Sequence, residues 1–290
     1  PMRNYFFAII IVLATVIACG KDDITPTGGD ETNNPPQANL PVENKLDVAY
    51  GTNQLQKMDI YLPANRTTAT TKVIFLIHGG AWMSGDKRDA DFAPVVDSIR
   101  KRLPDWAVIN VNYRLYNIIA NRFPAQEEDV KKAIEYVYAN RNNYAISDKW
   151  VYTGASAGGH LALLQGYKYT TPIKPLAIVN YFGPSDLPKL IAEETDSDLK
   201  FGMPILFAGT ETASSPVTYI TSQSAPTITL QGVGDATVPK SQQEALHAKL
   251  RAANVPEQLH IYTDEGHGFT AATMTKSFNS VIAFLNTHVK

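Results

Sequence analysis

The stretch YTGASAGGHLALLQG, at residues 152–166, decides the fold. At its centre residues 154–158 read Gly-Ala-Ser-Ala-Gly, with the β-type residues WVYT before them and a helix-forming run after them. A serine on such a strand-to-helix turn is held in a strained conformation that exposes its Oγ at the carboxyl end of the strand. Small residues two positions before and after it let strand and helix approach closely. The alternative is a small-residue turn without chemistry, and the rest of the chain decides between them.

Strand and helix patterns alternate on both sides of this stretch. We expect an antiparallel strand pair at 45–50 and 55–62, and further strands at 73–77, 107–111, 150–153, 176–182, 227–231 and 258–262. Several of these are unbroken apolar runs, which is typical of strands buried on both faces of a parallel sheet. One helix is expected after Phe123, and another begins at Ser241 with a capping-box pattern and runs to about Asn254. The sequence therefore predicts an α/β fold, an open and mostly parallel sheet flanked by helices.

A glycine-rich loop follows the strand at 73–77. It reads His78-Gly79-Gly80-Ala81-Trp82. Glycines there allow backbone N–H groups to face a ligand, which is how the loop after the third strand forms an oxyanion hole. A plain glycine turn is the alternative, but the combination with Ser156 favours an oxyanion loop.

An acid and a histidine follow the serine in the order that a catalytic triad on such a sheet requires. Asp235 directly follows the strand at 227–231, where a carboxylate can reach an imidazole, and we prefer it to Asp186, for which we expect a loop-capping role. His267 lies between glycines just after the last strand. A serine hydroxyl needs an imidazole to take its proton, and the imidazole needs a carboxylate to orient it. We therefore predict a reactive serine, Ser156, with His267 as base and Asp235 as orienting acid.

These segments together resemble a known family. His-Gly-Gly-x-Trp at 78–82, Gly-x-Ser-Ala-Gly-Gly-His at 154–160, Asn-Tyr-Arg-Leu at 112–115, Gly-Asp-x-x-Val-Pro at 234–239 and Gly-His-Gly-Phe at 266–269 are similar to α/β-hydrolase fold esterases. The most similar group contains hormone-sensitive-lipase-like carboxylesterases and bacterial feruloyl and acetyl-xylan esterases. The resemblance implies that the N–H groups of Gly80, Ala81 and Ala157 form the oxyanion hole. Ala81 stands where the commoner loop has a third glycine.

The resemblance also sets expectations for the substrate side of the site. Many relatives carry a helical cap before the sheet, whereas here only residues 187–214 could form a small lid. We therefore expect a small or absent cap and an open, shallow site. The candidate walls for the substrate are aromatic, namely Trp82, Tyr181, Phe182 and Phe269.

Composition narrows the range of partners. The 26 basic residues nearly balance the 28 acidic ones, so no field of one sign exists that would attract nucleic acid. The histidines are scattered, and the chain has a single cysteine, so we expect no metal site. No dinucleotide or phosphate loop is visible either. We expect an enzyme without a cofactor, and a small-molecule or polysaccharide ester as its substrate.

The first 41 residues differ in kind from the rest. Residues 5–18 form an apolar run of signal-peptide length that ends at Cys19, the one cysteine, in a context that resembles the lipobox of bacterial lipoproteins. Residues 20–41 are rich in Gly, Pro, Thr, Asn and Asp, which is typical of a flexible tether. We expect a signal peptide at 1–18, a lipidated Cys19 with its tether at 19–41, and a catalytic domain at 42–290. Lipid on Cys19 would anchor the protein to a membrane of the bacterial cell envelope.

The leading functional hypothesis is a serine esterase for short-chain carboxylic esters, such as acetyl or feruloyl groups on a polysaccharide. Two alternatives stay open. The same triad could cleave an amide, as in an arylformamidase or a peptidase, or the domain could be an inactive surface lipoprotein that binds a ligand. An intact triad with an oxyanion loop favours the esterase, because a binding protein has no use for all of these elements.

Overall fold

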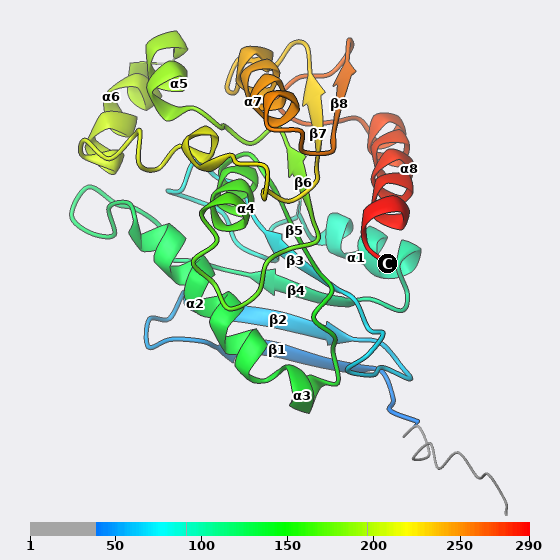
Figure 1. The fold of residues 1–290 in the computed structure, drawn as a ribbon. Helices are drawn as coiled ribbons and strands as arrows, with labels where there is room; N and C mark the ends of the chain where they lie inside the picture. The colour runs from blue at the N-terminus through cyan, green and yellow to red at the C-terminus, as the bar shows by residue number, and fades with distance from the viewer. Residues whose placement is uncertain (1–38, 91, 196) are drawn as a thin grey trace, which may run out of the picture. The chain divides into compact units, whose positions relative to one another are not determined.

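The computed structural model describes residues 39–90, 92–195 and 197–290. The expected signal peptide, Cys19 and nearly all of the tether lie outside the described residues. A single eight-stranded sheet has the order β1-β2-β4-β3-β5-β6-β7-β8, in which β2 pairs antiparallel with both β1 and β4 and all other neighbouring strands pair in parallel (Figure 1). The strands are β1 Glu43–Ala49, β2 Lys57–Leu62, β3 Val73–Ile77, β4 Ala107–Val111, β5 Trp150–Ala155, β6 Ala177–Tyr181, β7 Thr227–Gly232 and β8 Glu257–Tyr262.

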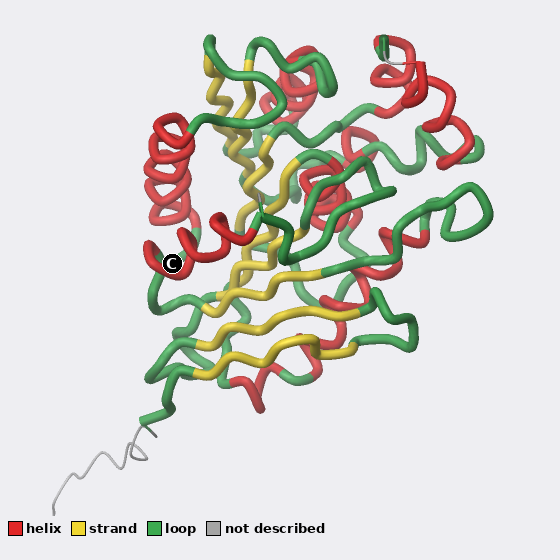
Figure 2. Tube along the Cα trace, turned by 180° about the vertical axis from the view of Figure 1, so that it is seen from behind, coloured by secondary structure: helices red, strands yellow, loops and turns green. Residues whose placement is uncertain are grey.

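Helices cover both faces of this sheet (Figure 2). On one face the core is formed with α2 Ala125–Ala139, α4 Ala157–Lys168 and α7 Lys240–Ala252, and on the other with α1 Ala93–Arg102 and α8 Ala271–His288. The shorter elements are α3 Arg141–Tyr144, α5 Leu187–Glu193, α6 Ser197–Phe207 and the 3₁₀ helix η1 Pro216–Tyr219. No helix of the described part is both long and apolar enough to cross a membrane.

Strand β3 shows why the sequence gives two cores. Its residues VIFLI are all buried, and successive side chains point to opposite faces. Val73, Phe75 and Ile77 therefore contribute to the core under α2, α4 and α7, whereas Ile74 and Leu76 contribute to the core under α1 and α8. A strand buried on both faces needs a continuous apolar run, so the interpretation of such runs as parallel strands is confirmed.

The eight expected strands are all present, and those at 73–77 and 107–111 have the predicted bounds. The prediction of a capping box at Ser241 is wrong. Helix α7 begins one residue earlier, at Lys240, with Pro239 at the N-cap and no side-chain cap. The Ser241 hydroxyl instead donates to Glu193 Oε2 (2.7 Å), and Glu244 pairs with Lys240. Both cap partners are thus engaged elsewhere, while the helix ends at Ala252, close to the expected end near Asn254.

Candidate active site

Ser156 lies between the end of β5 and the first residue of α4, in a conformation that few non-glycine residues adopt. Its backbone angles are φ 54° and ψ −124°, and its N–H donates to the carbonyl oxygen of Tyr181 (2.9 Å). A Cβ atom at Gly158 would lie 2.1 Å from the carbonyl oxygen of Ile77. Only glycine therefore lets α4 start this close to β3, and this contact fixes the strained turn.

His267 joins Ser156 to Asp235. Its Nε2 lies 2.9 Å from Ser156 Oγ, and its Nδ1 lies 2.8 Å from Asp235 Oδ2. Because Nδ1–H donates to the carboxylate, Nε2 is free to accept the hydroxyl proton of the serine. The three residues come from the loops after β5, β7 and β8, which the parallel sheet brings to one edge.

Both oxygens of the Asp235 carboxylate accept hydrogen bonds. The carboxylate is buried, and its Oδ1 accepts the backbone N–H groups of Thr237 (3.0 Å) and Val238 (2.8 Å), while Gln231 Nε2 donates to Oδ2 (3.2 Å). Asp186, the rival acid, is the N-cap of α5 and accepts the N–H of Lys189 (3.2 Å). The loop-capping role expected for Asp186 is therefore confirmed, and the acid in contact with His267 is Asp235.

The loop after β3 lies directly against Ser156. A Cβ atom at Gly79 would be 3.3 Å from Ser156 Cβ. Gly80 (φ 103°) and Ala81 (φ 50°) both have left-handed conformations, and Gly80 accepts hydrogen bonds through its carbonyl oxygen. In the part of the chain that the structure describes, the N–H groups of Gly80, Ala81 and Ala157 donate to no loop, turn or side-chain acceptor. These donors beside the serine are available to a ligand oxygen.

Two buried rings under this loop hold its backbone. The Tyr113 hydroxyl donates to the carbonyl oxygens of His78 (3.0 Å) and Gly79 (3.2 Å), and the rings of Tyr113 and His78 stack with centroids 4.3 Å apart. His78 Nδ1 lies 2.7 Å from the Gly79 carbonyl oxygen, and burial lowers the pKa of His78. A neutral imidazole and a phenol therefore support the loop without adding charge beside the serine.

Sequence reasoning missed a second histidine that connects the parts of the site. The Trp82 indole Nε1 donates to His160 Nδ1 (3.2 Å), and His160 Nε2–H donates to the carbonyl oxygen of Ser214 (2.7 Å). Burial lowers the pKa of His160 to about 4, so this ring is neutral. It ties the oxyanion loop, helix α4 and the 187–214 insertion together. The signal was available, because His160 stands one helical turn after Ser156.

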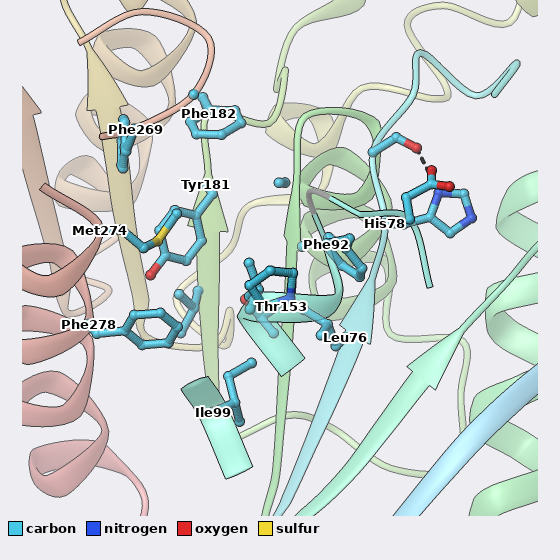
Figure 3. A pocket seen from close by; sticks show the side chains of 18 of the residues that line it. Leu76, His78, Phe92, Ile99, Thr153, Tyr181, Phe182, Phe269, Met274 and Phe278 are labelled. Atoms are coloured by element: carbon cyan, nitrogen blue, oxygen red, sulfur yellow. Dashed lines mark hydrogen bonds between the residues drawn. The ribbon is translucent and has the colours of Figure 1, made fainter. Parts of the chain in front are cut away.

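A cavity adjoins the triad through His267, although Ser156 itself is not among its lining residues. It has a volume of about 810 Å³ and runs from His267 and Gly80 down the sheet face that α1 and α8 cover (Figure 3). Tyr181, Phe182 and Phe269 line it, as expected of substrate walls. Trp82 does not, because its ring is buried on the opposite face with Phe207 (5.2 Å between centroids). The small lid expected at 187–214 forms α5 and α6.

The described residues contain no group of three or more His, Cys, Asp and Glu side chains that could hold a metal ion. The polar atoms at the site are instead arranged around the serine hydroxyl. Their chemistry is that of a nucleophile with its base, its orienting acid and backbone donors for a developing negative charge.

Comparisons with known proteins agree with this geometry. The BD-FAE family model matches residues 58–250. The probable carboxylic ester hydrolase LipM of Mycobacterium tuberculosis is 27% identical over 260 residues, which cover 82% of this chain and 59% of LipM. The chain thus spans about 60% of the length of this curated relative.

Two solved structures share the fold. A bifunctional GH43-CE protein of Bacteroides eggerthii is 28% identical (TM-score 0.69), and the match covers 83% of this chain and 38% of that one. A truncated carbohydrate esterase from gut microbiota is 23% identical (TM-score 0.71), covering 88% and 99%. With a family model that matches most of its length, the chain belongs to the BD-FAE family and has the α/β-hydrolase fold.

Proposed function

We propose that this protein is a serine hydrolase that cleaves carboxylic esters through a covalent acyl-enzyme. The observation that carries the proposal is His267, whose two ring nitrogens contact Ser156 Oγ (2.9 Å) and Asp235 Oδ2 (2.8 Å) at once. This is the arrangement that makes a serine nucleophilic. Membership of the BD-FAE family and the similarity to LipM, a probable carboxylic ester hydrolase, support an ester as the substrate.

The proposed mechanism uses each group once in each half-reaction. Ser156 Oγ attacks the ester carbonyl carbon while His267 Nε2 takes the hydroxyl proton, and Asp235 stabilises the imidazolium. The carbonyl oxygen becomes an oxyanion that accepts the N–H groups of Gly80, Ala81 and Ala157. Collapse of this intermediate breaks the bond to the alcohol, which leaves with the proton from His267. Water, deprotonated by His267, then releases the acid and restores Ser156.

The alcohol half of the ester is a sugar in this proposal. Two structural neighbours support it by name, since one is a GH43-CE protein and the other a carbohydrate esterase. Among the described residues, the insertion at the carboxyl edge of the sheet provides the short helices α5 and α6 and no large cap above the serine. A polymer can approach such a site, and acetyl and hydroxycinnamoyl esters of polysaccharides are the first substrates to test.

The test is a substrate panel with a matched variant. Wild-type protein should hydrolyse p-nitrophenyl esters, and Ser156→Ala should lose turnover by at least about 10⁴-fold while keeping its circular dichroism spectrum and melting temperature. Acetylated xylan, methyl ferulate and an N-formyl aromatic amine complete the panel. Faster cleavage of the formyl amide than of every ester would replace the esterase by the amidase alternative. If folded wild-type protein turned over none of these substrates, the remaining hypothesis would be a binding protein.

We also propose that lipid on Cys19 anchors the enzyme to the bacterial cell envelope. The support is the sequence alone, an apolar run that ends at the one cysteine of the chain. In cells given a labelled fatty acid, wild-type protein should take up label and Cys19→Ala should not. Equal labelling of the two proteins would refute the anchor.

A further inference from the structure

The carboxylate of Asp235 has a hydrogen-bond donor that lies outside the triad and its own loop. A carboxylate offers about four lone-pair sites. On Oδ1, two of these sites accept the backbone N–H groups of Thr237 (3.0 Å) and Val238 (2.8 Å). On Oδ2, the other two face His267 Nδ1 (2.8 Å) and Gln231 Nε2 (3.2 Å). The Gln231 amide therefore shares one carboxylate oxygen with the imidazole of the base.

Gln231 reaches this oxygen from the end of β7. Ile228 and Leu230 on the same strand belong to the core under α1 and α8. Because successive side chains of a strand alternate, Gln231 points to the opposite face of the sheet. Its side chain is fully buried there. A buried amide destabilises a fold unless both its N–H and its C=O groups find partners, so the contacts of this side chain need an explanation.

The amide nitrogen of Gln231 is surrounded by acceptors. Besides Asp235 Oδ2, Nε2 lies 3.0 Å from the carbonyl oxygen of Gly232 and 3.1 Å from that of Val238. This end of the side chain must carry the N–H groups, because an oxygen there would face only acceptors. Gln231 Oε1 is buried without a hydrogen-bond partner among the described residues. An apolar side chain would avoid that unpaired acceptor, so the value of Gln231 lies in its donors.

We propose that Gln231 is a positioning residue of the triad, an inference that rests on the serine hydrolase function proposed above. Its N–H occupies one lone-pair site of Asp235 Oδ2, so the Nδ1–H of His267 can approach this oxygen from one remaining direction. The imidazole is thereby fixed about the Nδ1···Oδ2 contact, with Nε2 at 2.9 Å from Ser156 Oγ. Without the Gln231 N–H a second direction opens to the ring, and the reactive geometry is populated for less of the time.

A clamp on the loop is the alternative role for this amide, since Nε2 also joins Gly232 and Val238. Loss of a clamp lowers stability but leaves the chemistry of the folded enzyme unchanged. Gln165 on α4 provides a matched control, because its buried Nε2 donates to the Glu127 carbonyl oxygen (2.7 Å) and its Oε1 also lacks a described partner. It lies about two and a half helical turns from Ser156.

The experiment compares Gln231→Met with Gln165→Met, which both replace a buried amide by an apolar side chain of similar length. It measures kcat and KM on p-nitrophenyl acetate, the rate at which a fluorophosphonate probe labels Ser156, and the melting temperature. Gln231→Met should lower kcat and the labelling rate by roughly 10- to 100-fold, the range for residues that orient metal ligands. KM should stay within about twofold, because His267 serves both half-reactions. Gln165→Met should keep both rates within about twofold.

A double-mutant cycle tests whether the effect of Gln231 passes through Asp235. In the Asp235→Ala background no carboxylate is left to orient, so Gln231→Met should lower the labelling rate by at most about twofold further. If Gln231→Met does not fold, Gln231→Asn takes its place. The amide of that variant is withdrawn by one C–C bond, about 1.5 Å, and no longer reaches Oδ2, so the same loss is expected.

The outcomes separate this inference from the proposed function. Wild-type kcat in folded Gln231→Met, an equal loss in Gln165→Met, or an undiminished effect in the Asp235→Ala background would overturn the positioning role and leave the esterase function intact. If folded wild-type protein cleaved no ester but was labelled at Ser156, the ester proposal would be wrong, and the labelling rates would still decide the role of Gln231. Folded wild-type protein that is neither active nor labelled would overturn both proposals.

Discussion

The two faces of the sheet differ in how they are filled beneath Ser156. On the face covered by α2, α4 and α7, four rings pack tightly, with Trp82 and Phe123 lying 5.2 and 4.9 Å from the Phe207 centroid and His160 lying 5.2 Å from Trp82. On the face covered by α1 and α8, a cavity of about 810 Å³ adjoins the triad through His267. The filled face fixes the backbone around the serine, and the open face offers space to a substrate.

The difference follows from how many elements cover each face. Three helices and the 187–214 insertion pack against the filled face, and buried hydrogen bonds from His160 connect them. In the described part of the chain, the open face is covered by α1 and α8 alone, and Arg102 of α1 contacts Asn279 and Phe278 of α8. A rigid oxyanion loop requires tight packing, because donors must stay where the charge develops. A binding cavity requires that packing be absent nearby.

The largest expected effect on catalysis comes from a change at Asp235, the acid of the triad, which lies at the sheet edge between the two faces. Asp235→Asn should lower kcat by about 10⁴-fold, as in the serine protease precedent, because the amide favours the wrong tautomer of His267. Asp186→Asn is the matched control. It changes only the cap of α5, so kcat should stay within about threefold and the stability should fall by at most about 1 kcal/mol. The assignment fails if Asp186→Asn inactivates the enzyme and Asp235→Asn does not.

Truncation of one buried side chain on each face tests the comparison directly. Leu161 on α4 is fully buried in the filled core, so Leu161→Ala should cost about 2–5 kcal/mol of unfolding free energy, the usual range when a cavity is created. Ile99 is 3% exposed, but part of its side chain lines the cavity, where partner atoms are missing. We expect Ile99→Ala to cost about 1–2 kcal/mol, below that range. Urea unfolding of both variants measures the difference, and equal costs would mean that the two faces are packed alike.

The fold could be predicted from the sequence because its main signals are local. The apolar run at 73–77 and the Gly-x-Ser-x-Gly turn each report their own structure, since buried parallel strands and a strained turn restrict residue types at adjacent positions. The order of Ser156, Asp235 and His267 along the chain also pointed to one sheet edge. The structure brings their side chains together, and their catalytic roles stay predictions.

The cavity and the contact between Trp82 and His160 could not be predicted, because both depend on how distant segments meet. Trp82 and His160 are 78 positions apart, and the aromatic ring of Trp82 could equally have faced a substrate. The space between α1 and α8 depends on how two helices separated by some 170 residues lie on the sheet. The residue pattern of each helix does not indicate how much space lies between the two helices. The sequence therefore suggested a shallow site.

A pH effect of intermediate size should come from the filled face. Burial lowers the pKa of His160 from the usual 6.5 to about 4, so between these values the unfolded chain binds more protons than the folded one. The stability from this group is complete above pH 6.5 and is lost as the pH falls toward 4. At 1.36 kcal/mol per pKa unit, the loss is on the order of 3 kcal/mol.

The measurement is urea unfolding at pH 7 and pH 4 for wild type and His160→Gln. The advantage of wild type over the variant should shrink by about 3 kcal/mol at the lower pH. His288 on α8, the control, is more exposed, and burial lowers its pKa as well, so the change for His288→Gln should be smaller. An advantage that stays constant with pH would show that His160 is not the source of the acid sensitivity.

The smallest expected effect compares two tryptophans, one on each face. Trp82→Phe removes the indole N–H that donates to His160 Nδ1 (3.2 Å), which leaves a buried acceptor without its partner at a cost of about 1–2 kcal/mol. Because Trp82 follows Ala81 directly, freedom gained by this ring should also loosen the oxyanion loop and lower kcat a few-fold, with little change in KM. Trp106 packs in the core of the open face, and its indole makes no hydrogen bond to any described residue. Trp106→Phe should therefore leave kcat unchanged. Thermal unfolding and p-nitrophenyl acetate kinetics on both variants provide the test, and an equal loss of kcat in the two would mean that the filled face has no special role in holding the loop.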